Sequence, residues 1–405
     1  MNKRYIKKII FGILCSPVYI VCSFIKRDRH IWVFGSWYGK TYSDNSAYLF
    51  EFVNSYKKNI KAIWITKNRK VISLLKGKGY QVYHAYSIFG LWYGSRAGVT
   101  IINCGYDDVN KYCIVKSFIV QLWHGIPIKK IKKDDKLNNI ESQNNFLKLI
   151  KFHTIKIFPF LSEHYDVIIS SSKIVTEKLE TAFSGCFNKI FETGYPRMDI
   201  ISSKNEINID RLIKRERYGG KLILYAPTHR QEGKTEINIL QRNDIYTIND
   251  FLIKSNALML IKSHEYEKQK NWESKIKGLD NIIFLDQTID IDVNMLLPYI
   301  DILITDYSSI FYDFIILDKP IIFFPFDITH YNQVDRKFYG NYNKQTPGVK
   351  CYNWSDIIIE IKKIFSGQDS FVLERQIIVE ETYKYKDIYN CSRIVDLIKK
   401  ELVYN

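Results

Sequence analysis

The amino-acid sequence predicts an α/β protein with two doubly wound domains, each built around a parallel sheet. Apolar runs such as "WVF", "AIWI" and "ILIT" lack the alternation of half-exposed strands, which indicates strands buried on both faces. Stretches with helical spacing separate most of these runs, as βαβ units require. The 405 residues, 46% of them hydrophobic, are enough for two separate cores.

The first domain is preceded by an N-terminal segment, residues 1–29. Its residues 9–25 are mostly apolar, contain Pro17, and are flanked by Lys and Arg on both sides. The stretch is slightly short for a spanning helix, and the basic "KRDRH" that follows is not typical of a signal peptide. We expect a membrane-associating segment, either an in-plane anchor or a single span, with the bulk of the chain on the cytoplasmic face. A buried first helix is the alternative.

Strand candidates then define a first domain (residues 30–200) and a second (residues 201–405). In the first, strands are expected in "HIWVFGSWYG", "KAIWITKN", "GYQVYHA", "GVTIINCG", "SFIVQLWHG", "DVIISSS" and "IFETGYPRMD". After the polar residues 201–221 the pattern restarts in "LILYAPTHR", "ALMLIKSHE", "NIIFLD", "DILITDYSS" and "PIIFFPFD". Because open parallel sheets bind ligands at the carboxyl ends of their strands, we expect a central cleft lined by polar strand ends.

The composition favours an anionic partner in a reducing compartment. A formal net charge of +16 attracts phosphorylated substrates, acidic lipid headgroups or nucleic acid, while a solvated basic surface is the plain alternative. Seven cysteines without a CxxC pair indicate neither a disulfide framework nor a zinc site. The sequence contains no P-loop, no GxGxxG motif and no basic–aromatic motif for nucleic acid, so nucleic acid is not expected as a partner.

The stretch "DILITDYSSIFYDF" (residues 301–314) changes from a buried strand to a helix through a short polar seam. Thr305, Asp306, Ser308 and Ser309 lie in this seam, and apolar residues recur at helical spacing after it. Backbone N–H groups at a helix start attract phosphate, and Ser and Thr hydroxyls add donors. The seam therefore predicts a phosphate-binding site. The competing interpretation is that Ser308 or Ser309 only caps the helix.

Two histidines also follow predicted strands. His124 and Gly125 end "QLWHG", where an imidazole can accept a proton from an attacking hydroxyl and the glycine lets a ligand approach the backbone. His264 ends the run "LIKSH", two residues after Lys262. A buried core histidine is the competing interpretation at each position. The joint occurrence of these residues with the polar seam favours a functional site.

A further polar strand end, "LYAPTHR", contains Thr228 and Arg230, and Arg230 offers paired hydrogen bonds to a phosphate. A lysine cluster at residues 129–133 either meets phosphate or membrane or forms a solvated face. A metal clamp is not expected, although "DQTIDID" (residues 286–292) is an acidic candidate. The cations can neutralise a diphosphate without an obligatory metal, and Mg²⁺ stays open as an assisting ion.

The strings "QLWHGIPIKKI", "GYPRMD", "LYAPTHR", "IKSHE" and "LITDYSSIFYDFIILDKPIIFFPFD" together resemble the motifs of the CDP-glycerol glycerophosphotransferase family. That family builds teichoic acids and related capsular polymers in bacteria. "VFGSWYGKTYSDNSAYLFE" is similar to its N-terminal pattern, and the resemblance covers about residues 30–350 in the expected order. It implies a GT-B-like fold with an N-terminal acceptor domain and a C-terminal domain for the CDP-linked donor.

The resemblance also implies a reaction. Glycerol phosphate passes from CDP-glycerol to a hydroxyl of a lipid-linked saccharide or growing polymer, with release of CMP, at an anionic membrane surface. The family histidines fall on His124, which the resemblance favours as the base, and on His264, which would hold the donor diphosphate; exchanged roles stay open. The residues expected to bind substrate are Gly125, Thr228, Arg230, Lys262, Thr305, Asp306, Ser308 and Ser309.

Two departures from the family pattern leave the donor open. His229 stands where the family has Trp, and Met198 where it has Asn. CDP-ribitol or another CDP-polyol is therefore an alternative donor. A UDP-sugar-dependent transferase or epimerase on the same architecture, and a non-catalytic basic module, are the remaining alternatives; donor turnover distinguishes them.

Overall fold

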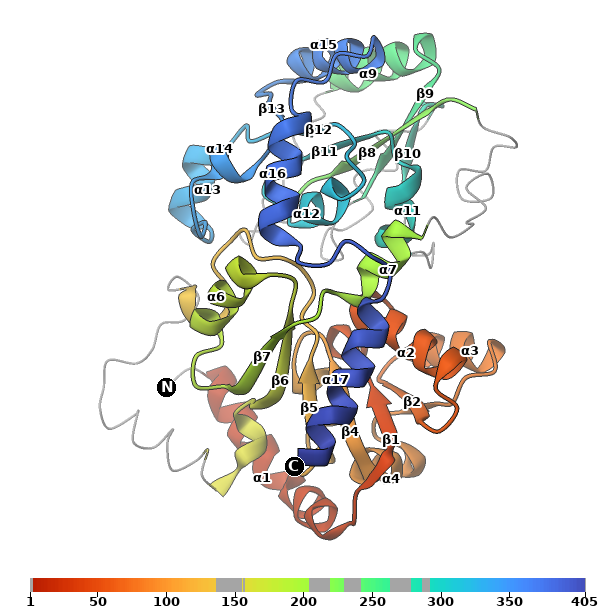
Figure 1. Cartoon of the computed structure of the whole chain (residues 1–405), viewed down its shortest axis with the longest axis vertical. Helices are drawn as coiled ribbons and strands as arrows, with labels where there is room; N and C mark the ends of the chain where they lie inside the picture. The colour runs from red at the N-terminus through yellow and green to blue at the C-terminus, as the bar shows by residue number, and fades with distance from the viewer. Residues whose placement is uncertain are drawn as a thin grey trace. The chain divides into compact units, whose positions relative to one another are not determined.

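A computed structural model describes residues 3–135, 155, 157–203, 219–228, 242–262, 278–285 and 292–404 (Figure 1). The chain forms two compact units. Unit 1 comprises Met1–His124, Asn138–Asp199 and Asp387–Asn405, and unit 2 comprises Gly125–Leu137 and Ile200–Lys386.

The chain crosses between the units at more places than the sequence predicts. Residues 125–137 and 387–405 each belong to the unit opposite to the expected one. The C-terminal helix α17 (Asn390–Tyr404) is tied to unit 1, because Asn390 Nδ2 donates to Asp199 at 2.6 Å. Strand patterns do not reveal such a contact, since its partners are 191 residues apart in the chain.

Unit 1 is built on a seven-stranded parallel sheet with the order β3-β2-β1-β4-β5-β6-β7. Its strands are β1 (Asp28–Phe34), β2 (Lys61–Thr66), β3 (Val82–His84), β4 (Ala97–Ile102), β5 (Phe118–Gln121), β6 (Tyr165–Ser170) and β7 (Phe187–Glu192). Its other helical elements are α1 (Lys3–Phe24), η1 (Trp37–Gly39), α2 (Asp44–Tyr56), α3 (Arg69–Gly77), α4 (Ile88–Arg96), η2 (Tyr106–Asp108), η4 (Pro159–Leu161) and α6 (Lys173–Ala182). Helix α7 (Pro196–Ser202) leads from unit 1 into unit 2.

Unit 2 is built on a six-stranded parallel sheet with the order β10-β9-β8-β11-β12-β13. Its strands are β8 (Lys221–Ala226), β9 (Ala257–Ile261), β10 (Ile282–Phe284), β11 (Ile302–Thr305), β12 (Ile321–Phe323) and β13 (Val349–Lys350). Its helical elements are η3 (Lys132–Asp134), α9 (Arg242–Lys254), α11 (Val293–Leu296), η5 (Leu297–Tyr299), α12 (Ile310–Ile315), α13 (Ile328–Val334), α14 (Tyr342–Gln345), α15 (Trp354–Phe365) and α16 (Val372–Thr382).

The predicted fold class is confirmed, since both sheets are parallel and helices connect their strands. Apolar side chains on both faces of the strands are buried. On one face of the unit 2 sheet, Ile223, Met259 and Ile304 pack with Trp354 of α15. On the other face, Leu224, Leu260 and Leu303 are buried. Each sheet has one point where the strand order reverses, between β1 and β4 in unit 1 and between β8 and β11 in unit 2. Loops that leave such neighbouring strands diverge, and ligands of doubly wound sheets bind there.

Arg375 on α16 is a buried cation that joins two turns of unit 2. Its guanidinium donates to Asp369 at 2.6 Å and to Asp318 at 3.0 Å. Burial alone would raise the pKa of Asp369, but the hydrogen bonds from Arg375 and the Phe371 N–H, together with the charge of Arg375, lower that pKa overall. A carboxyl group with a lowered folded-state pKa stabilises the fold above its ordinary pKa, and this contribution is lost as the pH falls through the folded pKa.

We expect Arg375→Gln to lower the free energy of unfolding by about 2 kcal/mol near neutral pH, because charged hydrogen bonds are lost. The difference from the wild type should shrink as the pH falls from about 4, the ordinary pKa of Asp, through the lowered folded-state pKa of Asp369. Urea unfolding at neutral and acidic pH measures both effects. Lys363→Gln, which removes an exposed pair with Glu360, is the control. Equal losses at both pH values would contradict the ion-pair explanation.

Candidate functional site

The carboxyl ends of β8 and β11 bring two predicted site segments together at the reversal point of unit 2. Thr305 Oγ1 donates to the Ala226 carbonyl at 2.7 Å, and the Thr228 N–H donates to Asp306 Oδ1 at 2.8 Å. The side chains of Thr305, Asp306 and Thr228 are buried. Thr305 and Asp306 therefore hold the two strand ends together. This positioning role differs from the substrate contact that the sequence predicts for them.

Ser308 and Ser309 are the half-buried hydroxyls of the seam, directly before α12. The Ser309 side chain makes no capping hydrogen bond, and Ser308 Oγ accepts the Ile310 N–H only at 3.4 Å. Helix capping thus explains Ser308 weakly and Ser309 not at all. Contact of these two hydroxyls with a substrate stays a prediction.

Packed tyrosine side chains hold this seam in place. Tyr307 stacks on Tyr331 with ring centroids 4.1 Å apart, and its hydroxyl donates to Asp327 at 2.9 Å. The Tyr342 hydroxyl donates to the Asp306 carbonyl at 2.8 Å. Because packed rings leave little room for rotation, these tyrosines limit how the backbone of Ser308 and Ser309 can be oriented.

The neighbouring predicted positions are only partly described. Lys262 follows β9, is half-buried, and its N–H donates to the Tyr225 carbonyl at 2.9 Å, which places it beside β8. His264 and Arg230 lie outside the described residues. Substrate binding by these three side chains therefore stays a prediction.

His124 lies just beyond the carboxyl end of β5 and is half-buried. Trp123, before it, has a φ of 53°, which bulky residues rarely adopt, and its N–H donates to the Gln121 amide oxygen at 2.9 Å. The Trp123 ring centroid is 4.1 Å from that of the imidazole. Backbone strain of this kind persists only where the surroundings enforce it, and it clusters at functional sites.

A buried ion pair fixes the backbone of His124. Arg197 Nη1 donates to the His124 carbonyl at 2.9 Å and lies 3.3 Å from Asp44 Oδ1. Asn45 Nδ2 donates to the Trp123 carbonyl at 2.9 Å, while Asn45 Oδ1 accepts the Arg197 N–H at 3.1 Å. The Arg197 and Asp44 side chains are 3% and 7% exposed, so water and salt screen the pair little. These three residues position His124.

Asp44, Asn45 and Arg197 are site residues that sequence reasoning did not single out. The sequence offers two weak signals, the polar start of α2 in "SDNS" and the charged "GYPRMD" after β7. Arg197 and His124 are 73 residues apart, and Arg197 and Asp44 are 153 apart. No local periodicity links such distant partners, so the ion pair appears only in three dimensions.

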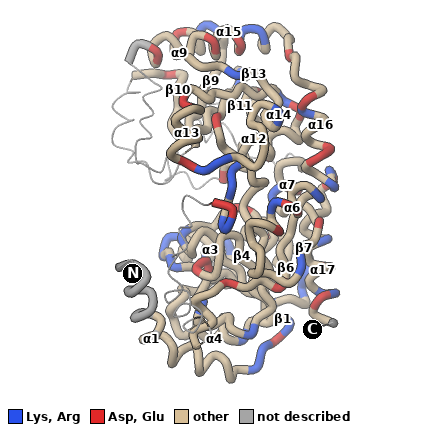
Figure 2. Tube along the Cα trace, turned by 90° about the vertical axis from the view of Figure 1, so that its left-hand side faces the viewer, with Lys and Arg blue, Asp and Glu red and all other residues tan. Residues whose placement is uncertain are grey.

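The residues that follow His124 belong to unit 2, where they pair with the connection between α13 and α14. The Lys130 N–H donates to the Lys337 carbonyl at 2.7 Å, and the Tyr339 N–H donates to the Ile128 carbonyl at 3.0 Å. The Tyr339 hydroxyl also donates to Asp134 at 2.6 Å. The lysine cluster at 129–133 thus lies on a segment whose backbone is hydrogen-bonded to the connection between α13 and α14. Figure 2 shows Lys and Arg in both units, interleaved with Asp and Glu.

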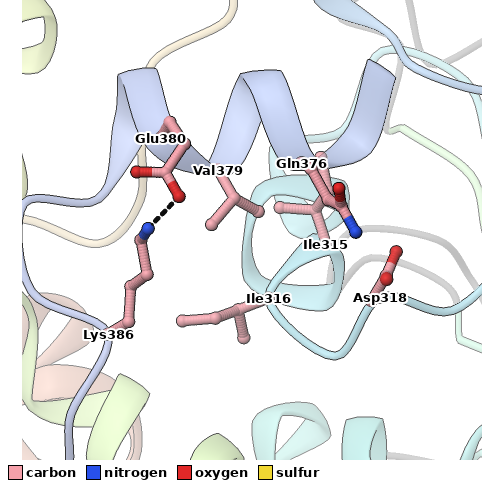
Figure 3. A pocket seen from close by; sticks show the side chains of 7 residues that line it. All are labelled: Ile315, Ile316, Asp318, Gln376, Val379, Glu380 and Lys386. Carbon is pink, nitrogen blue, oxygen red and sulfur yellow. Dashed lines mark hydrogen bonds and ion pairs between the residues drawn. The ribbon is translucent and has the colours of Figure 1, made fainter. Parts of the chain in front are cut away.

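One hollow of unit 2, about 170 Å³ in volume, lies between α12 and α16 (Figure 3). Glu380 and Lys386 form an ion pair at its rim. The hollow is lined by Ile315, Ile316, Asp318, Gln376, Val379, Glu380 and Lys386. Because no residue predicted for substrate binding lines it, this hollow does not contribute to the candidate site.

Within the described ranges, no group of three or more His, Cys, Asp or Glu side chains is placed to hold a metal ion. The acidic candidate at 286–292 lies outside those ranges except for Asp292, whose carboxylate accepts the Asn294 N–H at 3.0 Å and caps α11.

Relatives of known activity cover nearly the whole chain. The family model described as "CDP-Glycerol:Poly(glycerophosphate) glycerophosphotransferase" matches residues 18–400. A teichoic acid glycerol-phosphate transferase of Staphylococcus aureus is 27% identical over 423 residues, covering 99% of this chain and 100% of the relative. A teichoic acid poly(glycerol phosphate) polymerase of Bacillus spizizenii is 31% identical over 365 residues, covering 86% of this chain and 87% of the relative.

Solved structures agree with the fold. The wall teichoic acid polymerase TagF matches 99% of this chain and 97% of its own, with a TM-score of 0.76 and 24% identity. A UDP-N-acetylglucosamine 2-epimerase matches 94% of this chain and 98% of its own, with a TM-score of 0.53 and 12% identity. At these identities the likeness establishes the fold, which is GT-B-like.

Proposed function

Because the chain belongs to the CDP-glycerol:poly(glycerophosphate) glycerophosphotransferase family, we propose that it transfers glycerol phosphate from CDP-glycerol to a hydroxyl of a lipid-linked saccharide or teichoic-acid-type polymer. The observation that carries the chemical assignment is the half-buried His124, held at a strand end by the buried Arg197–Asp44 pair. A base held in this way is aligned before its substrate arrives, which lowers the entropic part of the barrier.

In the proposed reaction the acceptor oxygen attacks the β-phosphorus of CDP-glycerol. A new P–O bond forms, His124 takes the proton of the acceptor hydroxyl, and the bond from the β-phosphorus to the bridging oxygen breaks. The electron pair of that bond leaves on CMP. Ser308 and Ser309 donate to the diphosphate oxygens, and Lys262 supplies positive charge.

Four further residues are assigned to substrate binding by family resemblance. His264 and Arg230 are assigned to the diphosphate, Gly125 to close approach of the substrate to the backbone, and Thr228 to substrate binding. Mg²⁺ is an optional assistant in this scheme. Addition of EDTA to the assay measures whether the ion contributes.

The experiment that tests the proposed function is a comparison of donors. Purified protein is incubated with membrane extract and CDP-glycerol, CDP-ribitol or UDP-N-acetylglucosamine, and nucleotide release is followed. We expect release of CMP with CDP-glycerol. Turnover of CDP-ribitol alone would reassign the polyol, and turnover of the UDP-sugar alone would overturn the proposal.

We expect Ser309→Ala to raise the KM for CDP-glycerol by about fivefold, since one neutral hydrogen bond contributes roughly 1 kcal/mol. The Ser308→Ala, Ser309→Ala double variant should show a larger increase. Ser366→Ala, at the end of α15, is the matched control because its exposed hydroxyl bonds only a local carbonyl in α15. An unchanged KM for the donor in the double variant would remove these hydroxyls from the diphosphate site.

We further infer that α1 lies along an anionic membrane surface as an in-plane anchor, on the cytoplasmic face. Leu14, Val21 and Phe24 share one side of the helix and are 72%, 62% and 84% exposed. The other side packs inward, with the Tyr19 ring 5.0 Å from that of Phe160. Among the described helices none combines the length and apolarity that crossing a bilayer demands. An exposed apolar stripe beside basic residues suits the interface instead.

Replacing Leu14, Val21 and Phe24 with Ser should weaken binding to vesicles of mixed anionic and zwitterionic phospholipid. Each fully inserted apolar side chain contributes about 1.5–3 kcal/mol, so even partial insertion predicts a loss of tenfold or more in the partition coefficient. Vesicle sedimentation measures it. The control is Leu373→Ser with Ile377→Ser, which removes two exposed apolar side chains of α16. Equal binding by both variants would reject α1 as the anchor.

A further inference from the structure

The reversal point of unit 1 carries two aromatic residues beside His124. The loop that leaves β1 contains Trp37 and Tyr38, and the neighbouring strand β4 ends before Asn103. Trp37 is half-buried and Tyr38 is 49% exposed, so both present ring surface. The Trp37 ring centroid lies 5.1 Å from that of the His124 imidazole. Crevices at such reversal points are where doubly wound sheets bind ligands.

The aromatic loop is held in a conformation that its residues do not favour. Trp37, Tyr38 and Gly39 have φ values of 44°, 59° and 77°, in the left-handed region that bulky side chains rarely adopt. The strain is compensated by hydrogen bonds, since the Trp37 N–H donates to Asn103 Oδ1 at 3.2 Å and the Tyr38 N–H to Asp108 Oδ1 at 2.6 Å. Strained backbone of this kind marks sites where the geometry itself is used.

Asp108 is the anchor of this loop. Its other carboxylate oxygen accepts N–H groups of Asn103 at 2.9 Å and Cys104 at 2.7 Å. Burial raises the pKa of Asp108 to about 6, although these N–H donors favour its ionised form. A Cβ on Gly35 would lie 2.5 Å from the Asp108 carbonyl, so the loop has no room to shift at this point. The backbone that carries Trp37 and Tyr38 is therefore held in place, and these two aromatic residues are called the platform.

We propose that Trp37 and Tyr38 form the subsite for the sugar ring of the acceptor, with the indole of Trp37 packed against the C–H face of a pyranose. This inference rests on the proposed function in one respect, that His124 activates the acceptor hydroxyl. A ring platform 5.1 Å from the imidazole holds a sugar hydroxyl within reach of the base. Apolar C–H faces pack against aromatic rings, whereas a chain of glycerol phosphates is flexible, charged at every unit and has no ring face.

The charges around the platform agree with a neutral ligand. Lys67 Nζ donates to the Asp107 carbonyl at 2.6 Å, and Lys111 pairs with the Asp107 carboxylate at 3.4 Å. Lys67 and Lys111 lie beside the carboxylates of Asp107 and Asp108, which offset the two positive charges within the same unit. The platform thus differs from the Ser308–Ser309 seam, to which the proposed function assigns the charged donor.

The test uses the full-length protein and needs no turnover in its first arm. Alkyl glycosides of hexoses and N-acetylhexosamines are titrated in saturation-transfer difference NMR, and a glycerol phosphate oligomer serves as the comparison ligand. We expect saturation of the pyranose C–H protons in the wild type, a loss of at least tenfold in affinity with Trp37→Ala, and partial recovery with Trp37→Phe. Trp92→Ala is the matched control, because Trp92 is 50% exposed on α4 and packs on Arg96.

The second arm is kinetic. Trp37→Ala should raise the KM for a glycoside acceptor about tenfold or more and leave the KM for CDP-glycerol unchanged. A rise in the KM for CDP-glycerol would show that Trp37 stacks on the cytosine base, and equal losses with the oligomer would show that the platform does not select sugars; either result overturns the inference. If the wild type does not use CDP-glycerol, the proposed function is wrong. The NMR experiment would still test whether Trp37 and Tyr38 bind a sugar ring.

Discussion

The His124→Ala variant is expected to lose CMP release almost completely while it keeps its fold. A positioned general base contributes about 10²–10⁴-fold to the rate, so kcat should fall by roughly a thousandfold. The fold should survive, because Arg197 bonds the backbone carbonyl of His124, which the substitution leaves in place. CMP release from CDP-glycerol at saturating acceptor, together with thermal unfolding, measures both parts.

His30→Ala is the control for this experiment, since His30 is an exposed histidine near the amino end of β1. Near-normal turnover by His124→Ala would show that His124 is not the base. The same assay with His264→Ala then distinguishes an exchange of roles from a different mechanism. A loss of cooperative unfolding in His124→Ala would show a structural role in place of a chemical one.

The second large effect is expected at Arg197, where substitution should harm stability and catalysis together. Arg197→Met leaves the Asp44 carboxylate buried without its cation, which typically costs about 3–5 kcal/mol. It also removes the donor to the His124 carbonyl, so kcat should fall even in the molecules that remain folded. Urea unfolding and CMP release, corrected for the folded fraction, separate the two losses.

A double variant sharpens this second test. Asp44→Asn combined with Arg197→Met removes both charges, so much of the lost stability should return while kcat stays low. Lys221→Met, which breaks a more exposed pair with Asp301, should cost less than about 1 kcal/mol. If the double variant recovers kcat as well, Arg197 does not position His124 and the account of the site is wrong.

Much of the architecture follows from periodicity in the sequence. Continuous apolar runs identify β8, β9 and β11, and their parallel order follows from the helices between them. Strand β13 is not predicted from the sequence, because its two residues are too few to form an apolar run. The rule that ligands bind at strand ends selects His124, Ser308 and Ser309, which the structure places beyond strands and half-buried; their role in the site stays a prediction. It cannot tell that the Thr305 hydroxyl turns inward to the Ala226 carbonyl.

The parts that the sequence does not disclose are those that depend on distant partners. Asp44 looks like an ordinary residue at a helix start, yet it is buried against Arg197. Trp37 looks like a core aromatic after a strand, yet a positive φ turns it toward His124. Composition and periodicity report how buried a residue is, whereas these pairings are set by how the sheets bring loops together.

The exchange of segments between the units has a consequence for synthesis. The final helix α17 covers part of unit 1, yet the ribosome makes it only after the entire second sheet. During translation, unit 1 therefore lacks the contacts with α17 until the end of the chain has been made. Its packing cannot be completed when its own strands leave the ribosome. Nascent chains of this protein should gain protease resistance in a late, concerted step, and a partner that shields apolar surface should associate with them until then.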